Sequence, residues 1–290
     1  MNQRRRNVLP LNKVKVDDFF WNKYTRLVTD QIIPYQWEAL NDCVEDAEPS
    51  HCIKNFEIAA GLREGEFEGA VFQDTDLAKW LEAVAYSLAY EPDAELEKRA
   101  DAMIDLIGKA QQPDGYLDTY FIIKEPDKKF CNLREGHELY TAGHFMEAAV
   151  AYYQVTGKEK FLHIMQRVAD LICEVFHQEA FQQAVPGHEE VEIGLIRLYQ
   201  VTGERRYLEM AKDFVDTTVE PVVTYESGLL GGTDVIRLSG KRMDAEAWSS
   251  DALYAEKRVP LKETELTLVP YCYWGNRKTG EMQTWMKFLQ

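Results

Sequence analysis

The sequence predicts a mainly α-helical protein built from helical hairpins, with a short β-rich segment at its C-terminal end. The first observation is a repeat, because Tyr199–Gly203 has the same five residues as Tyr153–Gly157, 46 positions earlier. Each copy closes one apolar helical stretch and precedes another, and a fixed period of this size is typical of stacked helical hairpins. The second observation is the loss of helical periodicity after about residue 219, where β-branched residues and glycines become frequent.

The Thr-Gly pair that ends each copy has a physical role. Gly157 and Gly203 can adopt the left-handed conformation that ends a helix, because glycine has no Cβ to oppose it. A looser third copy lies upstream, where Ala83–Tyr86 matches Ala149–Tyr152 and Glu91–Asp93 replaces the glycine turn. Three copies, each between two helices, indicate an architectural repeat.

The N-terminal region is predicted to begin extended, over residues 1–16. Asp17 or Asp18 then caps a first helix, because a carboxylate accepts the free N–H groups of a helix start. A second helical stretch follows Pro34, and residues 43–55 form a polar loop.

Apolar spacing predicts the remaining helices. The chain is expected to be helical from Phe56 to Trp80 with a break at residues 65–69. Further helices are expected at Leu77–Leu88, Glu95–Ala110, His137–Val155, Lys158–Phe176, Glu189–Val201 and Arg205–Thr218. Long loops, one of them with a turn at Pro113–Gly115, alternate with the short turns. We expect the long loops to gather at one end and to form the site.

The sequence divides into a helical domain, residues 1–219, and a β-rich tail, residues 220–290. Strands are expected at Pro221–Tyr225, Val235–Leu238 and Glu263–Val269. The last of these alternates apolar and polar residues, as a half-buried strand does.

Composition excludes several classes of function. The net charge is −16, and an acidic chain repels nucleic acid. No apolar stretch is long enough to span a bilayer and no signal peptide is evident, so we expect no membrane partner and a cytoplasmic location. The five cysteines include no C-x-x-C pair, which argues against a disulfide framework and a compact zinc site.

The candidate binding residues are His137, His188 and Asp74. Both histidines stand where a long loop enters a helix, and His144 follows His137 after two helical turns; a local hydrogen bond or helix cap is the alternative for each ring. Asp74 and Asp76 offer the paired carboxylates that glycosidases use, although for Asp76 capping of the helix at Leu77 is preferred.

Several segments together resemble glycoside hydrolase family 127, the β-L-arabinofuranosidase family. They are Ile33–Trp37, Val71–Asp76, Lys79–Glu82, Gln111–Thr119, Gly136–Tyr140, Gly187–Glu189, Gly228–Asp234, Leu268–Tyr271, Trp274–Arg277 and Gly280–Met282. The resemblance implies an (α/α)6 toroid followed by β-sandwiches, and retaining hydrolysis of β-L-arabinofuranosides by a zinc-bound cysteine and an acid/base glutamate. His137 and His188 match family histidines that contact the sugar, so an L-arabinofuranoside-type carbohydrate is the expected partner.

The resemblance also implies that the middle of the family's chain is absent here, with the junction near Val219–Ser227. We therefore expect only a partial toroid, no catalytic residue, no metal ligand and no cofactor, and a hydrolase that is inactive or impaired. Two alternatives stay open: a non-catalytic carbohydrate-binding or interaction module, and a different hydrolase or lyase with Asp74 and His137 as acid and base. Apolar helix faces left uncovered by missing hairpins predict self-association.

Overall fold

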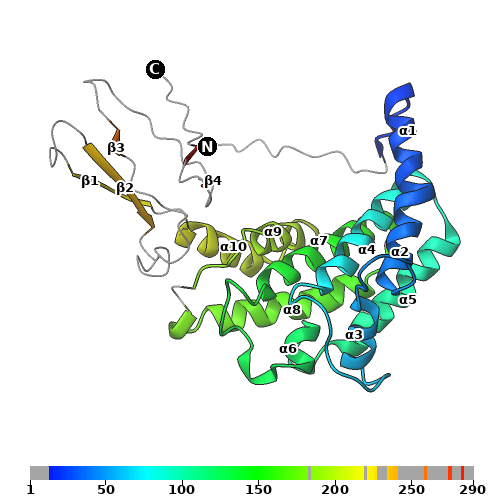
Figure 1. The fold of residues 1–290 in the computed structure, drawn as a ribbon, viewed down its shortest axis with the longest axis horizontal. Coiled ribbons are helices and arrows are strands. Elements are labelled where there is room, and N and C mark those ends of the chain that lie inside the picture. Colours follow the sequence, from blue (N-terminus) through cyan, green and yellow to red (C-terminus); the bar gives the residue numbers. More distant parts are fainter. Residues whose placement is uncertain are drawn as a thin grey trace. The chain divides into compact units, whose positions relative to one another are not determined.

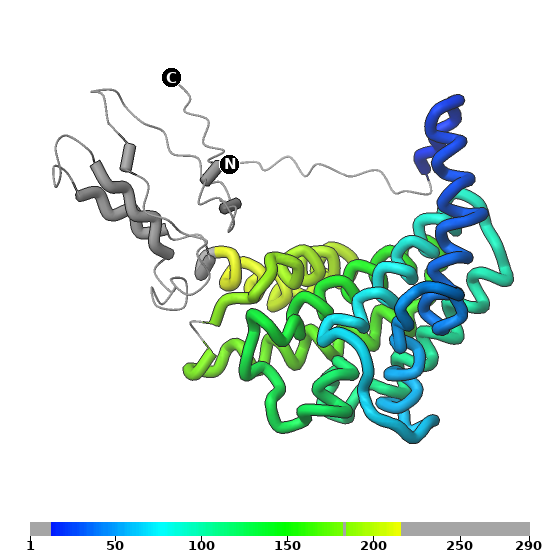
Figure 2. The backbone as a smooth tube through the Cα atoms, in the orientation of Figure 1, coloured from blue at the N-terminus to red at the C-terminus, as the bar shows by residue number. Residues whose placement is uncertain are grey.

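The structure is a computed structural model that describes residues 13–181 and 184–218, together with five short strands further along the chain. The chain divides into two compact units, Met1–Phe214 and Val215–Gln290. The first, here called the helical unit, contains the well-packed core, and the coloured part of the tube in Figure 2 traces its backbone. The division falls close to the domain boundary predicted at residues 219–220, which stays a prediction.

A continuous helical run opens the described chain. It consists of α1 (Phe19–Leu27), a π-helical turn η2 (Val28–Ile32) and α2 (Ile33–Leu40), so the two expected helices are joined rather than separated. Of the two predicted caps, Asp17 and Asp18, the cap is Asp18, whose carboxylate accepts hydrogen bonds from the N–H groups of Phe20 and Trp21 at 2.8 and 2.7 Å. No residue of α1 is buried.

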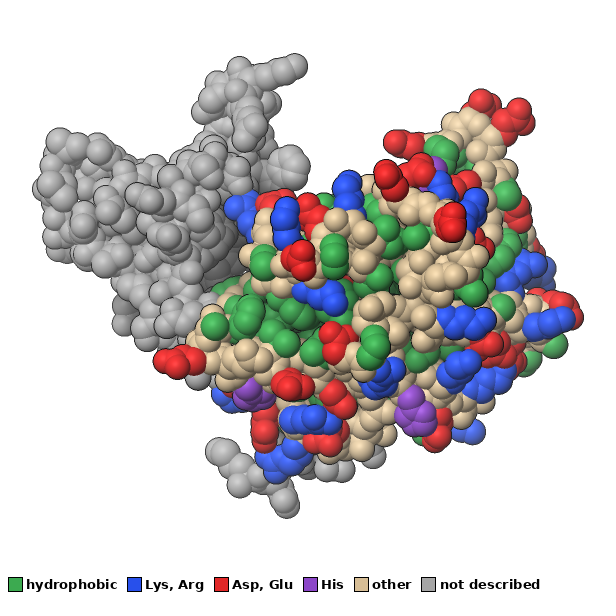
Figure 3. Space-filling model, turned by 90° about the horizontal axis from the view of Figure 1, so that it is seen from below, with side chains coloured by type: hydrophobic (Ala, Val, Ile, Leu, Met, Phe, Trp, Pro, Cys, Tyr) green, Lys and Arg blue, Asp and Glu red, His purple; other side chains and the backbone are tan. Residues whose placement is uncertain are grey.

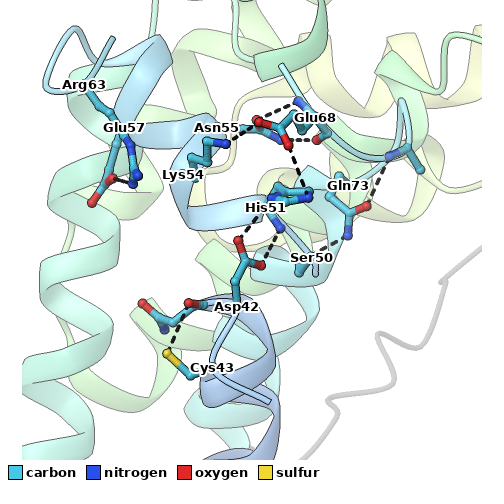
Figure 4. Close-up of polar contacts among 12 residues, drawn as sticks. Asp42, Cys43, Ser50, His51, Lys54, Asn55, Glu57, Arg63, Glu68 and Gln73 are labelled. Carbon is cyan, nitrogen blue, oxygen red and sulfur yellow. Dashed lines mark hydrogen bonds and ion pairs between the residues drawn. The ribbon is translucent and has the colours of Figure 1, made fainter. Parts of the chain in front are cut away.

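The next segment differs from the prediction. Helix α3 (Cys52–Ala59) is followed by non-helical chain up to α4 (Asp74–Tyr90), so the helix expected from residue 56 to residue 80 is interrupted far more widely than residues 65–69. Gly61, at φ +67°, ends α3, and the Asn55 side chain then holds the loop by hydrogen bonds with both the N–H and the C=O of Glu68 (Figure 4). These long-range contacts override the local helical pattern.

Three helical hairpins follow, and a short turn joins the two helices of each. They are α4 with α5 (Ala94–Ala110), α7 (Glu138–Thr156) with α8 (Lys160–Phe176), and α9 (Val191–Thr202) with α10 (Arg205–Thr218). Gly157 and Gly203 end α7 and α9 in the left-handed conformation, at φ +73° and +75°, which confirms the role predicted for the Thr-Gly pair. The long connections carry α6 (Thr119–Ile123), η3 (Pro126–Lys128) and η4 (Glu179–Phe181).

The first helices of the three hairpins pack side by side, with α7 between α4 and α9 (Figure 1). They run in the same direction, because Lys79 of α4 contacts Tyr140 of α7 and, further along, Glu82 of α4 and Glu147 of α7 both contact Arg197 of α9. Gly143 of α7 and Gly194 of α9 lie where these two helices meet, and a Cβ at Gly194 would stand 2.8 Å from the Gly143 carbonyl oxygen. The close approach brings the start of α9 against α7.

The described strands all follow α10. They are β1 (Pro221–Glu226), β2 (Asp234–Gly240), β3 (Arg258–Val259), β4 (Trp274–Gly275) and β5 (Met282–Gln283). β2 pairs antiparallel with β1 and with β3, and β4 pairs antiparallel with β5. The first two overlap predicted strands, whereas the strand expected at residues 263–269 lies outside the described residues. The described chain is thus mainly helical.

The surface of the helical unit carries charges of both signs, with hydrophobic side chains exposed between them (Figure 3). The largest exposed group belongs to α1, where Phe19 is 97% exposed and Phe20 and Trp21 are each 56% exposed. Among the described helices, none has both the length and the apolar character of a membrane span.

Candidate functional site

Aromatic and imidazole rings cluster where the N-terminal ends of α4, α7 and α9 meet. His137 is the N-cap residue of α7 and takes a left-handed conformation, φ +56°, with its Nδ1 2.7 Å from the carbonyl oxygen of Glu135. Its ring centroid lies 4.9 Å from that of His188, which precedes α9, and 5.2 Å from that of Phe72, which precedes α4. The two predicted histidines are thus brought together from loops far apart in sequence.

Tyr140 links these rings to the next turn of α7. Its ring centroid lies 5.0 Å from that of His188 and 4.5 Å from that of His144, one helical turn further along α7. The Lys79 ammonium, on α4, donates a hydrogen bond of 2.9 Å to the Tyr140 hydroxyl. We call Phe72, His137, Tyr140 and His188 the ring cluster.

Beyond the ring cluster, a polar group links the same helices. His144 Nδ1 lies 3.2 Å from Glu190 Oε1, just before α9. Glu147 Oε1 lies 2.7 Å from the Nε of Arg197, whose Nη1 lies 3.3 Å from Glu82 Oε1 on α4. Burial and then a hydrogen bond with Glu190 raise the pKa of Glu147 to about 7, while burial and then the Lys79 ammonium lower the pKa of His144. The His144 ring is therefore neutral at neutral pH.

Asp74 is placed differently from the histidines. It opens α4, is 2% exposed, and its carboxylate accepts hydrogen bonds from the N–H and the hydroxyl of Thr119, at 2.7 and 2.5 Å. These bonds fasten the start of α6 to α4. Burial raises the pKa of Asp74 to about 6. Asp76 is not the helix cap, since α4 already begins at Asp74; it accepts a hydrogen bond from the Gln73 side chain within the first turn.

A second buried carboxylate, Glu138, holds the long loop that precedes α7. It accepts a hydrogen bond from the Tyr116 hydroxyl and two from the N–H of Phe130, at 2.9 and 2.8 Å. Burial raises the pKa of Glu138 to about 7. The turn before Tyr116 is the predicted one, with Asp114 accepting from the Tyr116 N–H at 2.9 Å and Gly115 at φ +96°. Because Glu138 follows His137 directly, these bonds also fix the ring cluster.

The family resemblance implies a zinc-bound cysteine, and the described residues do not fit such a centre. Among them, Cys43 and Cys131 are exposed, whereas Cys52 and Cys173 are buried. The one described group that brings three potential metal ligands together consists of His144, Glu147 and Glu190, without a cysteine. No catalytic step through a zinc-bound thiolate is therefore derived for the described part of the chain.

A separate surface recess of about 480 Å³ lies near the turn between α7 and α8, and is lined by residues that include Tyr152, Lys158 and Phe161. Its Lys158 ammonium already pairs with Glu97 and Asp101, at 2.5 Å each. The recess lies at the C-terminal end of α7, whereas the ring cluster lies at its N-terminal end and contains both predicted histidines, so the ring cluster is the better candidate site.

The ring cluster can recognise a neutral ligand rich in hydroxyl groups. Imidazole nitrogens and the Tyr140 hydroxyl can donate or accept hydrogen bonds, and ring faces can pack against C–H groups. The sequence indicates His137 and His188 as site residues, whereas Phe72, Lys79 and Tyr140 carry no signal beyond their place in segments that resemble the family. Fold and site together define a helical-hairpin protein whose candidate site lies at the N-terminal ends of three parallel helices.

Comparison with known families agrees with this class. The family model described as beta-L-arabinofuranosidase, GH127 catalytic domain, matches residues 13–256. The chain belongs to this family.

Individual relatives are similar over most of the helical unit. The non-reducing end β-L-arabinofuranosidase of Bifidobacterium longum is 41% identical over 220 residues, which is 70% of this chain and 33% of that protein. The crystal structure of Ara127N-Se, a GH127 β-L-arabinofuranosidase from Geobacillus stearothermophilus T6, is 56% identical with a TM-score of 0.69, covering 71% of this chain and 32% of that one. A second GH127 β-arabinofuranosidase structure is 35% identical with a TM-score of 0.65, covering 72% and 33%. The chain thus spans about a third of the length of these relatives.

Proposed function

We propose that the helical unit is part of an (α/α)6 toroid that binds β-L-arabinofuranosides at the ring cluster. The family membership supports the class of sugar, since the relatives are described as β-L-arabinofuranosidases. The single observation that carries the proposal is the 4.9 Å approach of His137 to His188 at the N-terminal ends of parallel helices.

Each proposed residue has a distinct part. His188 is exposed and offers its ring to the sugar from the loop before α9, while the half-buried His137 ring packs between His188 and Phe72. Their nitrogens supply hydrogen bonds to sugar hydroxyls. Asp74 is buried, so its part is to hold the start of α4 and the Thr119 loop beneath the sugar rather than to take a proton from it.

Three hairpins arranged with their first helices side by side support a partial toroid. In such a ring the first helices of successive hairpins form the inner wall, and their loops form the binding end. Here α7 is buried on most sides, as an inner helix is, whereas α8 buries one face and exposes the other.

We further propose that this chain hydrolyses arabinofuranosides weakly or not at all. Retaining hydrolysis needs a nucleophile and an acid/base on opposite sides of the scissile bond. The ring cluster consists of aromatic and imidazole rings, and described carboxylates next to it are already engaged, Glu138 by Tyr116 and Phe130 and Glu190 by His144. With p-nitrophenyl β-L-arabinofuranoside, zinc and a reductant, we expect little release of nitrophenol; turnover at the rate of a full-length relative would contradict this part.

Calorimetry with methyl β-L-arabinofuranoside tests sugar binding independently of hydrolysis. His188→Ala should weaken binding at least about tenfold, equivalent to about 1.4 kcal/mol. The matched control is His163→Ala, because His163 is an exposed histidine on the outer helix α8. If the folded wild-type chain gives no heat at millimolar sugar, or both variants bind equally well, the proposal fails. Binding without hydrolysis would favour the carbohydrate-binding module over the hydrolase.

A further inference from the structure

We propose that His144, Glu147 and Glu190 bind one divalent transition-metal ion beneath the ring cluster. The three side chains come from one helix and the start of another: His144 and Glu147 are one turn apart on α7, and Glu190 immediately precedes α9. One potential ligand atom from each lies within 4.8 Å of the other two. An imidazole with two carboxylates is a donor set that zinc, manganese and cobalt accept.

A poorly satisfied polar atom in this group supports a missing ligand. Glu190 Oε1 is buried and has no hydrogen bond of good geometry within the described part of the chain, although His144 Nδ1 lies 3.2 Å away. The side chains themselves are 17% and 14% exposed, and that of Glu147 is 10% exposed. A buried carboxylate oxygen without a good hydrogen bond is costly, and a coordinated cation would satisfy it.

The spacing also suits a metal. Zinc bonds of about 2.0–2.2 Å place neighbouring ligand atoms of a tetrahedral site about 3.4 Å apart. His144 Nδ1 and Glu190 Oε1 already lie 3.2 Å apart. The Glu147 carboxylate keeps one oxygen on Arg197, at 2.7 Å, while a ligand atom of Glu147 lies within 4.8 Å of ligand atoms of His144 and Glu190. Three protein ligands would leave one position of the ion for water.

The charges around the group leave room for a cation. Glu82, Glu147 and Glu190 carry three negative charges when ionised, while Lys79 and Arg197 carry two positive charges. These carboxylates outnumber the cations by one, so a bound metal ion would offset the excess negative charge.

A bound ion would also act on the ring cluster. The His144 ring lies edge-on to Tyr140, with centroids 4.5 Å apart, and Tyr140 contacts His188. Coordination would fix the His144 ring and, through it, the Tyr140 ring. The ion is therefore a positioning element beneath the proposed sugar site, and it binds whether or not sugar is present.

Another histidine of this chain provides a matched control. His51 also lies between two carboxylates, Asp42 and Glu68, at 3.1 and 3.5 Å (Figure 4). These carboxylates face different ring nitrogens, so a single ion cannot contact all three residues. His51→Gln should leave metal binding unchanged.

The experiment titrates Zn²⁺ and Co²⁺ into the full chain after removal of metal with EDTA, using calorimetry and visible absorption. We expect one ion per chain and a Co²⁺ spectrum without a thiolate-to-cobalt charge-transfer band, which excludes the cysteines as ligands. Glu190→Gln and His144→Gln should each weaken binding at least about tenfold. Far-UV circular dichroism checks folding; if His144→Gln does not fold, Glu190→Gln decides, because the amide keeps an oxygen for the contact with His144 but lacks the negative charge that binds a cation. The proposal is overturned by the absence of saturable binding, by a thiolate band, or by undiminished binding to folded Glu190→Gln.

Discussion

The contact between α7 and α9 at Gly143 gives a sharp test of how the site is assembled. A Cβ at Gly143 would stand 2.7 Å from both the carbonyl carbon and the carbonyl oxygen of Glu190. These are backbone atoms, so they cannot move aside by a side-chain rotation. Gly143→Ala should therefore push the start of α9 away from α7 and disturb the contact between Glu190 and His144.

The magnitude follows from two opposing effects. Replacing glycine by alanine within a helix stabilises the folded state by about 0.5–1 kcal/mol. Overpacking at a fixed contact costs about 1–3 kcal/mol. We expect Gly143→Ala to lower the free energy of unfolding by about 1–2 kcal/mol. Gly108, in α5, is the control, because its added Cβ would meet only the flexible end of the Ile164 side chain, at 3.0 Å.

Urea denaturation followed by far-UV circular dichroism measures both variants. Gly108→Ala should be within about 1 kcal/mol of the wild type or more stable, and Gly143→Ala should be clearly less stable. The reasoning is refuted if Gly143→Ala equals or exceeds Gly108→Ala in stability. A crystal structure of the alanine variant with α9 undisplaced would refute it equally.

Three further outcomes are expected. Tyr116→Phe removes the hydroxyl bound to the buried Glu138 and should destabilise the chain by about 1–3 kcal/mol in urea denaturation; wild-type stability would contradict the structural role of this bond. The raised pKa values of Asp74 and Glu138, about 6 and about 7, mean that the folded state keeps these protons to higher pH than the unfolded state does. Their contribution to stability is therefore complete below the ordinary carboxyl pKa and is lost as pH rises through about 6 and 7. Urea midpoints that do not fall as pH rises to these values would contradict this prediction. Asp74→Asn should make the urea midpoint depend less on pH. The exposed Phe19 and Trp21 of α1 should make a second copy of the chain associate, and light scattering that shows a monomer at all concentrations would disprove this.

Local signals in the sequence predicted much of the helical unit. The Thr-Gly pairs, the cap at Asp18 and the turn at Gly115 each act over a few residues, so their effect can be derived without the rest of the chain. The start of α4 was mispredicted because α4 begins two residues before Asp76, with its first turn fastened to the distant Thr119 through Asp74.

The candidate site was predictable only in part. The loop-to-helix position of His137 and His188 follows from the repeat, and so does their meeting at one end. The group of His144, Glu147 and Glu190 depends on how closely α9 approaches α7, which two glycines in different helices determine. A glutamate at a helix start is explained by the helix dipole alone. The apolar periodicity of α7 and α9 therefore does not indicate that Glu190 faces the His144 imidazole.

The two Thr-Gly turns give two of the hairpins the same internal joint. Gly157 and Gly203 have nearly the same backbone conformation, and each links the two helices of one hairpin, α7 to α8 and α9 to α10. The geometry of each hairpin turn can therefore stay the same while the loops at the opposite end diverge in sequence and length. Changes in these loops can therefore alter ligand recognition while the helices that position the site stay the same.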